Sequence, residues 1–82
     1  MVSGHVQGVW FRESCRREAE ARDVSGVVAN RADGTVEAVF EGREPAVAEM
    51  VAWCRAGPPR AVVTGVDVSQ EEPEGLVGFG VR

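Results

Sequence analysis

Residues 24–41 read VSGVVANRADGTVEAVFE, and this stretch decides the fold because it predicts two neighbouring strands. Val24–Asn30 is short and rich in β-branched residues, which is typical of a strand. The Asp33-Gly34 pair then supplies a turn. Thr35–Glu41 alternates between apolar and polar residues, so one face of the second strand is apolar. The stretch therefore predicts a β-hairpin.

A helix is predicted on each side of this hairpin. Before it, the apolar residues Phe11, Cys15 and Ala19 recur every four positions between Trp10 and Arg22, and most residues between them are charged. That spacing gives an amphipathic helix with one apolar face.

The second predicted helix follows Gly42 and reads EPAVAEMVAWCRAG. Pro45 suits the first turn of a helix, and Gly57 suits the position just past its end. The apolar residues follow helical spacing; they are Val47, Met50, Val51 and Cys54.

Three further segments complete the predicted element order. Met1–Ser3 predicts only a fragment of a strand, Ala61–Val68 predicts a full strand, and residues 78–82 predict a short last one. Two split βαβ halves in this order are typical of an α+β fold, the ferredoxin-like α/β sandwich. We therefore expect βαββαβ plus a short C-terminal strand, forming one domain over residues 1–82. Both helices should cover one face of an antiparallel sheet, with Glu37 and Glu41 on the other face.

Composition limits the classes of function. The chain has 13 acidic and 9 basic residues and a net charge of −4, which argues against nucleic-acid binding because that needs a basic surface. No apolar run approaches the roughly 18 residues needed to cross a bilayer, and no leader opens the chain. We therefore expect a cytoplasmic protein with no membrane contact. Cys15 and Cys54 lack the spacing of a zinc site and are expected to be small buried hydrophobes.

The candidate site is the stretch GHVQGVWFRES, residues 4–14. Gly4 and Gly8 permit backbone angles that turn N–H groups inward around an anion, and a helix N-terminus follows. Arg12 would lie at the positive end of that helix, which disfavours a cation by about 0.3–1 kcal/mol unless an anion lies between them. From the residues alone, a tight turn with a surface arginine stays open beside a phosphate site. For Asn30 the reading as an ordinary turn residue at a strand end likewise stays open.

The chain resembles the acylphosphatase family in three motifs that follow one another in order. GHVQGVWFR is similar to the family signature G-[basic]-V-Q-G-V-x-[aromatic]-R. GVVAN, followed by DGTVE, resembles the family's G-x-x-x-N stretch and D-G-x-V-E run. GPPRAVVTGV resembles its later G-P-x-x-A-x-V-x-x-V pattern. The resemblance covers almost the whole chain and implies the same ferredoxin-like fold.

The resemblance implies a hydrolase that cleaves the carboxyl-phosphate bond of an acyl phosphate to a carboxylate and inorganic phosphate, with no metal or cofactor. It implies that Arg12 binds the phosphate and that Asn30 positions the attacking water. It also implies that backbone N–H groups of one loop cradle the phosphate. That loop comprises Gly4, His5, Val6, Gln7, Gly8 and Val9.

Other residues near the loop have less specific expectations. His5 stands where the family often has arginine or lysine, so its backbone N–H is the expected contributor. Gln7 either braces the loop or faces solvent. Trp10 and Trp53 are expected to pack, with Trp10 close enough to shape the rim of the pocket. The expected partners are a small acyl phosphate and inorganic phosphate or a similar anion, and the chain is expected to be a monomer.

Two questions stay open at this stage. Only Met1, Val2 and Ser3 precede Gly4, whereas family members usually have a full first strand in the middle of the sheet. A clipped chain, a start assigned at an internal methionine and a genuine loss that weakens the fold all explain this. The alternative function is a non-catalytic phosphate or carbamoyl-phosphate binding module, as in hydrogenase maturation proteins. Such modules are followed by further domains, so the end at Arg82 favours the free-standing enzyme.

Overall fold

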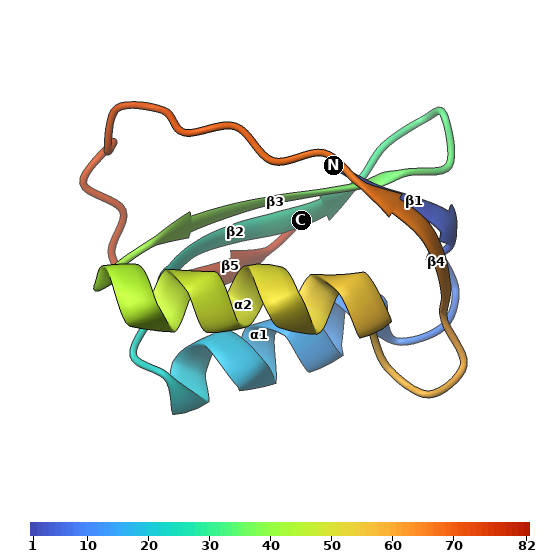
Figure 1. Cartoon of the computed structure of the whole chain (residues 1–82), viewed down its shortest axis with the longest axis horizontal. Helices are drawn as coiled ribbons and strands as arrows, with labels where there is room; N and C mark the ends of the chain where they lie inside the picture. Colours follow the sequence, from blue (N-terminus) through green and yellow to red (C-terminus); the bar gives the residue numbers. More distant parts are fainter.

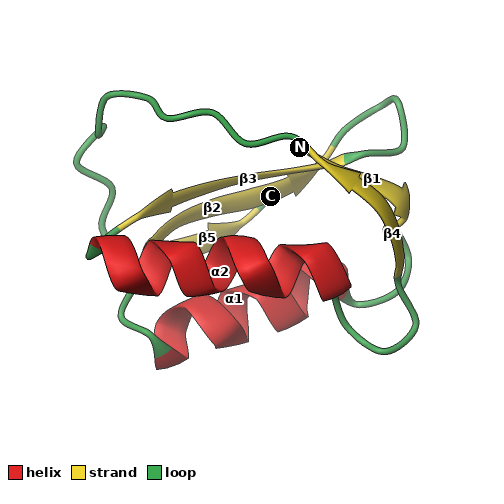
Figure 2. Ribbon diagram, in the orientation of Figure 1, coloured by secondary structure: helices red, strands yellow, loops and turns green.

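The predicted hairpin forms the centre of a five-stranded sheet in the computed structural model, and two helices cover one face of that sheet (Figures 1 and 2). All 82 residues are described. The strands are β1 (Val2–His5), β2 (Ser25–Asn30), β3 (Val36–Glu41), β4 (Val62–Val66) and β5 (Phe79–Val81). The helices are α1 (Phe11–Ala21) and α2 (Glu44–Ala56). This order confirms the predicted ferredoxin-like fold.

The strands lie in the order β4-β1-β3-β2-β5. β2 and β3 pair over the full hairpin, from Ser25 opposite Glu41 to Asn30 opposite Val36. The prediction of a wholly antiparallel sheet is wrong at one edge, because β5 pairs parallel to β2. Residues 67–78 return along the sheet before β5 begins, so β5 starts at the same end of the sheet as β2 (Figure 1).

β1 is longer at its C-terminal end than predicted. Gly4 and His5 belong to the strand rather than to the loop, because they pair with Val63 and Val62 of β4 beyond a bulge that follows Ser3. The bulge changes the register and lets the strand continue. On its other side β1 pairs with β3 at a single position, Val2 opposite Val36.

The core lies between the sheet and the helices. α1 buries the three residues predicted from its periodicity, Phe11, Cys15 and Ala19, and α2 buries Met50 and Cys54. The expectation of buried cysteines is confirmed, and both thiols are free. A hydrogen bond with the Cys54 thiol and burial raise the pKa of the Cys15 thiol above its ordinary value.

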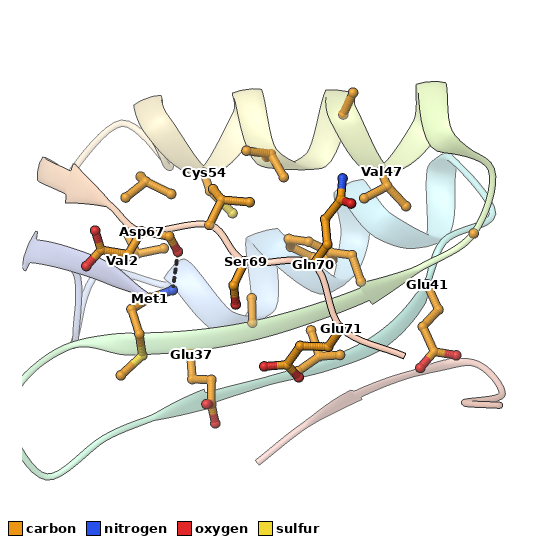
Figure 3. A pocket seen from close by; sticks show the side chains of 18 of the residues that line it. Met1, Val2, Glu37, Glu41, Val47, Cys54, Asp67, Ser69, Gln70 and Glu71 are labelled. Carbon is orange, nitrogen blue, oxygen red and sulfur yellow. Dashed lines mark hydrogen bonds between the residues drawn. The ribbon is translucent and has the colours of Figure 1, made fainter. Parts of the chain in front are cut away.

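The two faces of β3 divide as its alternation predicts. Val36 is buried, and Ala38 and Phe40 pack against the core under the helices. Glu37 and Glu41 point away from α2 (Figure 3). Of the helices, neither has the length and apolar character needed to cross a membrane.

Candidate functional site

The loop between β1 and α1 is fixed by two buried valines and two left-handed residues. Val6 and Val9 are buried in the core. Gly8 has φ 74°, and Trp10, the residue that precedes α1, has φ 64°. Trp10 is 74% exposed, so the predicted packing role is wrong for this tryptophan. Trp53 does pack, with its ring centroid 5.2 Å from that of Phe11.

Backbone N–H groups along this loop and the start of α1 have no partner. From residue 6 to residue 13, no backbone N–H donates a hydrogen bond within the protein; the first that does is that of Ser14, to the Trp10 carbonyl at 2.9 Å. Helix N-termini leave such donors and carry the positive end of the helix dipole. The left-handed turns at Gly8 and Trp10 are the kind of backbone that forms an anion-binding nest.

Gln7 ties the loop to the β2–β3 turn. Its Nε2 donates to the Arg31 carbonyl at 2.7 Å and to the Thr35 carbonyl at 3.0 Å. Both amide hydrogens are therefore used. The bracing role expected of Gln7 is confirmed, and the contact places the loop beside the residue that follows Asn30.

Asn30 is the last residue of β2, and its side chain is exposed and makes no hydrogen bond within the protein. The turn after it is held by Asp33, whose Oδ1 accepts from the Thr35 hydroxyl at 2.6 Å and the Thr35 N–H at 3.0 Å. These bonds lower the pKa of the Asp33 carboxyl. The Asn30 amide is therefore presented on a rigid support with its donors and acceptor free to bind a water.

Arg12 lies in the first turn of α1 and is half-buried. Its Nη1 donates to the Arg82 carbonyl at 2.6 Å, and the Arg82 N–H donates in turn to the Val28 carbonyl of β2 at 2.9 Å. The guanidinium is thus steered toward the strand that carries Asn30. No aspartate or glutamate side chain pairs with it, whereas Arg16 and Arg17, on the same helix, both pair with Glu13.

The predicted residues come from three places in the chain: the β1–α1 segment, the first turn of α1 and the end of β2. Gln7 connects the first of these to the turn after Asn30, and Arg12 contacts Arg82, which is bonded to Val28 of β2. His5 is exposed at the end of β1. Sequence reasoning missed Arg82, which holds Arg12. No local signal marks a contact between residues 70 positions apart. A groove of about 1260 Å³ lies elsewhere, because neither Arg12 nor Asn30 lines it.

Residues 1–81 match the acylphosphatase family. The chain belongs to the acylphosphatase family. It is 59% identical over 81 residues to an acylphosphatase from Thiobacillus denitrificans, covering 99% of this chain and 90% of that protein. The crystal structure of acylphosphatase from Bacillus subtilis matches with a TM-score of 0.94 at 39% identity, over 99% of this chain and 91% of that one.

A second kind of structure is also similar. The crystal structure of HypF from T. kodakarensis matches with a TM-score of 0.85 at 30% identity, covering 99% of this chain but 11% of that one. The acylphosphatase from Thiobacillus denitrificans is nearly twice as similar in sequence and has almost the same length as this chain. The predicted hydrolase of the acylphosphatase family is therefore confirmed.

Proposed function

We propose that this acylphosphatase hydrolyses acyl phosphates at the site formed by residues 4–9, at the end of β1 and in the loop after it, together with Arg12 and Asn30. The observation that carries the proposal is the run of backbone N–H groups at residues 6–13 that have no partner, next to an arginine that pairs with no aspartate or glutamate side chain. Together they offer many donors and positive charge to one small anion.

The loop and Arg12 bind the phosphoryl group. Backbone N–H groups surround its oxygens, and the helix dipole favours its charge. Arg12 donates one hydrogen bond to the main-chain oxygen of Arg82, and its remaining N–H groups are available to the phosphoryl oxygens. The dianion also removes the unfavourable contact between a cation and the positive end of α1. As the phosphoryl charge redistributes in the transition state, the same donors stabilise it.

Asn30 positions the water that attacks phosphorus. Its amide has no basicity, so it orients the water by hydrogen bonds and takes no proton. The water oxygen forms a bond to phosphorus as the bond between phosphorus and the acyl oxygen breaks. The electron pair of that bond leaves with the carboxylate, which is a good leaving group and needs no general acid. One water proton passes to an oxygen of the phosphoryl group, and the product is inorganic phosphate.

Inorganic phosphate, the product, should also inhibit the enzyme, because it carries the group that the site binds. No metal or other cofactor enters the scheme. The acidic surface disfavours nucleic-acid binding, and we expect the enzyme to be a cytoplasmic monomer. Two free buried thiols suit a reducing compartment.

The test is turnover of benzoyl phosphate by Arg12→Ala and Asn30→Ala. Loss of a donor to the transition state typically costs about 10²–10³-fold in kcat, so each variant should lose most of its activity. Circular dichroism must show that each variant is folded. Arg17→Ala is the matched control, because Arg17 lies on the same helix with its side chain 73% exposed, and it should keep full turnover. A folded Arg12→Ala or Asn30→Ala with full activity contradicts the role of that residue.

A further inference from the structure

The carboxylate of Glu13 belongs to the helix turn that borders the proposed phosphate site. Glu13 directly follows Arg12 in the first turn of α1 and stands three positions after Trp10, the residue that precedes the helix. Its side chain is 34% exposed, and its own backbone N–H is one of the unpaired groups of residues 6–13. A negative side chain at the start of a helix is attracted by the same dipole and the same donors as a phosphoryl group. Glu13 is therefore a potential competitor of the substrate.

A glutamate at this position can cap its own helix. Three residues after the residue that precedes a helix, its carboxylate can turn back and accept a hydrogen bond from the backbone N–H of that preceding residue. In this chain the Trp10 N–H has no partner, and no side chain caps the start of α1. Glu13 thus has the position of a cap but does not act as one.

Arg16 holds the Glu13 carboxylate in a different direction. Its Nε donates to Oε2 at 3.1 Å and its Nη2 donates to Oε1, so the guanidinium binds both carboxylate oxygens at once. Its Nη1 donates to the Glu20 carboxylate at 2.7 Å, one turn further along the helix. Bidentate pairs of this kind are stronger than single hydrogen bonds and fix the direction of both side chains. The carboxylate is therefore drawn along α1, away from the start of the helix.

Arg17 makes a weaker contact with the same carboxylate. Its Nε lies 3.4 Å from Oε1 of Glu13, and its side chain is 73% exposed. Exposed pairs of this kind contribute little to holding a side chain. The hydrogen bonds from Arg16 lower the pKa of the Glu13 carboxyl, which is therefore charged at neutral pH. The direction in which Glu13 is held consequently matters to a phosphate dianion.

We propose that Arg16 is a positioning residue of the phosphate site: it holds the Glu13 carboxylate off the start of α1 and so leaves the backbone N–H groups there open to a phosphoryl group. The inference rests on the proposed function, because it takes that stretch as the place where phosphate binds. Arg16 itself touches no substrate. Without the arginines that hold it, Glu13 would turn back, cap the helix and repel the phosphate by like charge.

The test uses Arg16→Ala/Arg17→Ala, in which neither base that contacts Glu13 is present. Titration calorimetry should show that the dissociation constant of inorganic phosphate rises about three- to tenfold, because an anion already occupies the start of the helix. Hydrogen exchange without phosphate should be slower than in the parent for at least one amide of residues 10–13, because a cap protects it. Arg17→Ala alone is the control and should match the parent, because Arg16 still binds both oxygens of Glu13.

A further substitution separates this mechanism from a simple loss of positive charge. Adding Glu13→Ala to the double variant should restore most of the phosphate affinity and the fast amide exchange. In the parent, Glu13→Ala should change the dissociation constant by less than about twofold, because the carboxylate is already held away. Charge acting at a distance would instead give Glu13→Ala the same effect in both backgrounds.

Two results would overturn the proposal once circular dichroism has shown that the variants are folded. One is unchanged exchange of the amides of residues 10–13 in the double variant, and the other is an equal effect of Glu13→Ala on phosphate affinity in both backgrounds. The exchange measurement needs no phosphate. It therefore tests the direction of Glu13 separately from the proposed function, which fails if the parent binds no phosphate.

Discussion

Gln7 is the residue that joins the two halves of the proposed site. Its side-chain amide is the contact that connects the β1–α1 loop to the turn after Asn30, through the carbonyls of Arg31 and Thr35. The family resemblance pointed to the loop, but the residues alone left Gln7 divided between bracing and facing solvent. The choice depends on where the hairpin turn lies in space, which the spacing of residues in the sequence does not contain.

We expect Gln7→Ala to destabilise the fold and impair catalysis together. Two carbonyls lose a donor, which corresponds to about 1–3 kcal/mol. Urea unfolding should show that loss, and the KM for benzoyl phosphate should rise because the phosphate loop is less fixed relative to Asn30. Gln70→Ala is the control, because that glutamine is exposed and makes no side-chain hydrogen bond; it should match the parent. A Gln7→Ala protein as stable and active as the parent would show that the brace is dispensable.

Arg12 and Asn30 illustrate how far single residues could be predicted. Their types and positions could be read from the motifs, whereas local physics alone favoured an ordinary surface or turn role for each of them and left the site reading open. The structure adds the reason that Arg12 is steered toward β2, namely its bond to the Arg82 carbonyl. That bond joins opposite ends of the chain, so only the folded arrangement reveals it.

At the scale of elements, periodicity predicted most of the fold. The alternation of β3 and the four-residue spacing of α1 each reflect one buried face, and both elements bury the faces expected. The errors fall where pairing, rather than periodicity, decides. Gly4 and His5 lack strand propensity but are held in β1 by β4, and β5 is parallel because of the path that the chain takes to reach it.

The bulge in β1 predicts a sharp contrast between two glycines on one ladder. Gly4 has φ 122°, and a Cβ there would lie 2.0 Å from the Val62 carbonyl oxygen. A Cβ at Gly65 of β4, which lies opposite Ser3, would meet no atom within 4 Å. Gly4→Ala should therefore lower the free energy of unfolding by about 1–3 kcal/mol or more, while Gly65→Ala should change it by less than about 1 kcal/mol. Equal effects in urea unfolding would contradict the described bulge.

Glu41 predicts a pH-dependent link between β3 and the segment before β5. Its carboxylate accepts from the Glu74 N–H at 2.8 Å and from the Leu76 N–H at 3.0 Å, and these bonds lower its pKa. A lowered pKa means that the contribution to stability is complete above the ordinary value of 4.5 and is lost as the pH falls through the folded value. The amide resonances of Glu74 and Leu76 should shift in that acidic range.

The variant Glu41→Gln provides the control for this link, because its amide oxygen does not titrate. The acid shift of the Glu74 and Leu76 amides should disappear in that variant. If the shift persists unchanged, another group controls the segment.

At the scale of the whole molecule, the two sides of β3 differ in the extent of their pairing. β2 joins β3 along the full hairpin, whereas β1 joins β3 at Val2 alone, and a groove of about 1260 Å³ lies beside that short seam. The sequence predicted a strand fragment over Met1–Ser3 only, whereas β1 runs from Val2 to His5. It could not predict the groove, which depends on how far residues 67–74 stand from β3.

Residues added before Met1 should lengthen β1 and pair with β3 beyond Val36. We expect an N-terminal extension of Lys-Val-Lys-Val before Met1 to raise the melting temperature by several degrees, since about 1 kcal/mol corresponds to about 4–8 °C in a domain of this size. The same extension with proline replacing one valine is the control and should give a smaller rise. An unchanged melting temperature for the first extension would contradict the idea that the open seam limits stability.

The central claim is that binding of the phosphate and positioning of the water are divided between different residues of one site. The most direct measurement compares the inhibition constant of inorganic phosphate with kcat for benzoyl phosphate in Arg12→Lys and Asn30→Ala. We predict that Asn30→Ala keeps phosphate inhibition close to that of the parent while kcat falls by about 10²-fold or more, and that Arg12→Lys loses phosphate affinity as well as kcat because it lacks the planar fork. A folded Asn30→Ala variant with undiminished kcat, or a folded Arg12→Lys variant with undiminished phosphate affinity, would contradict this division.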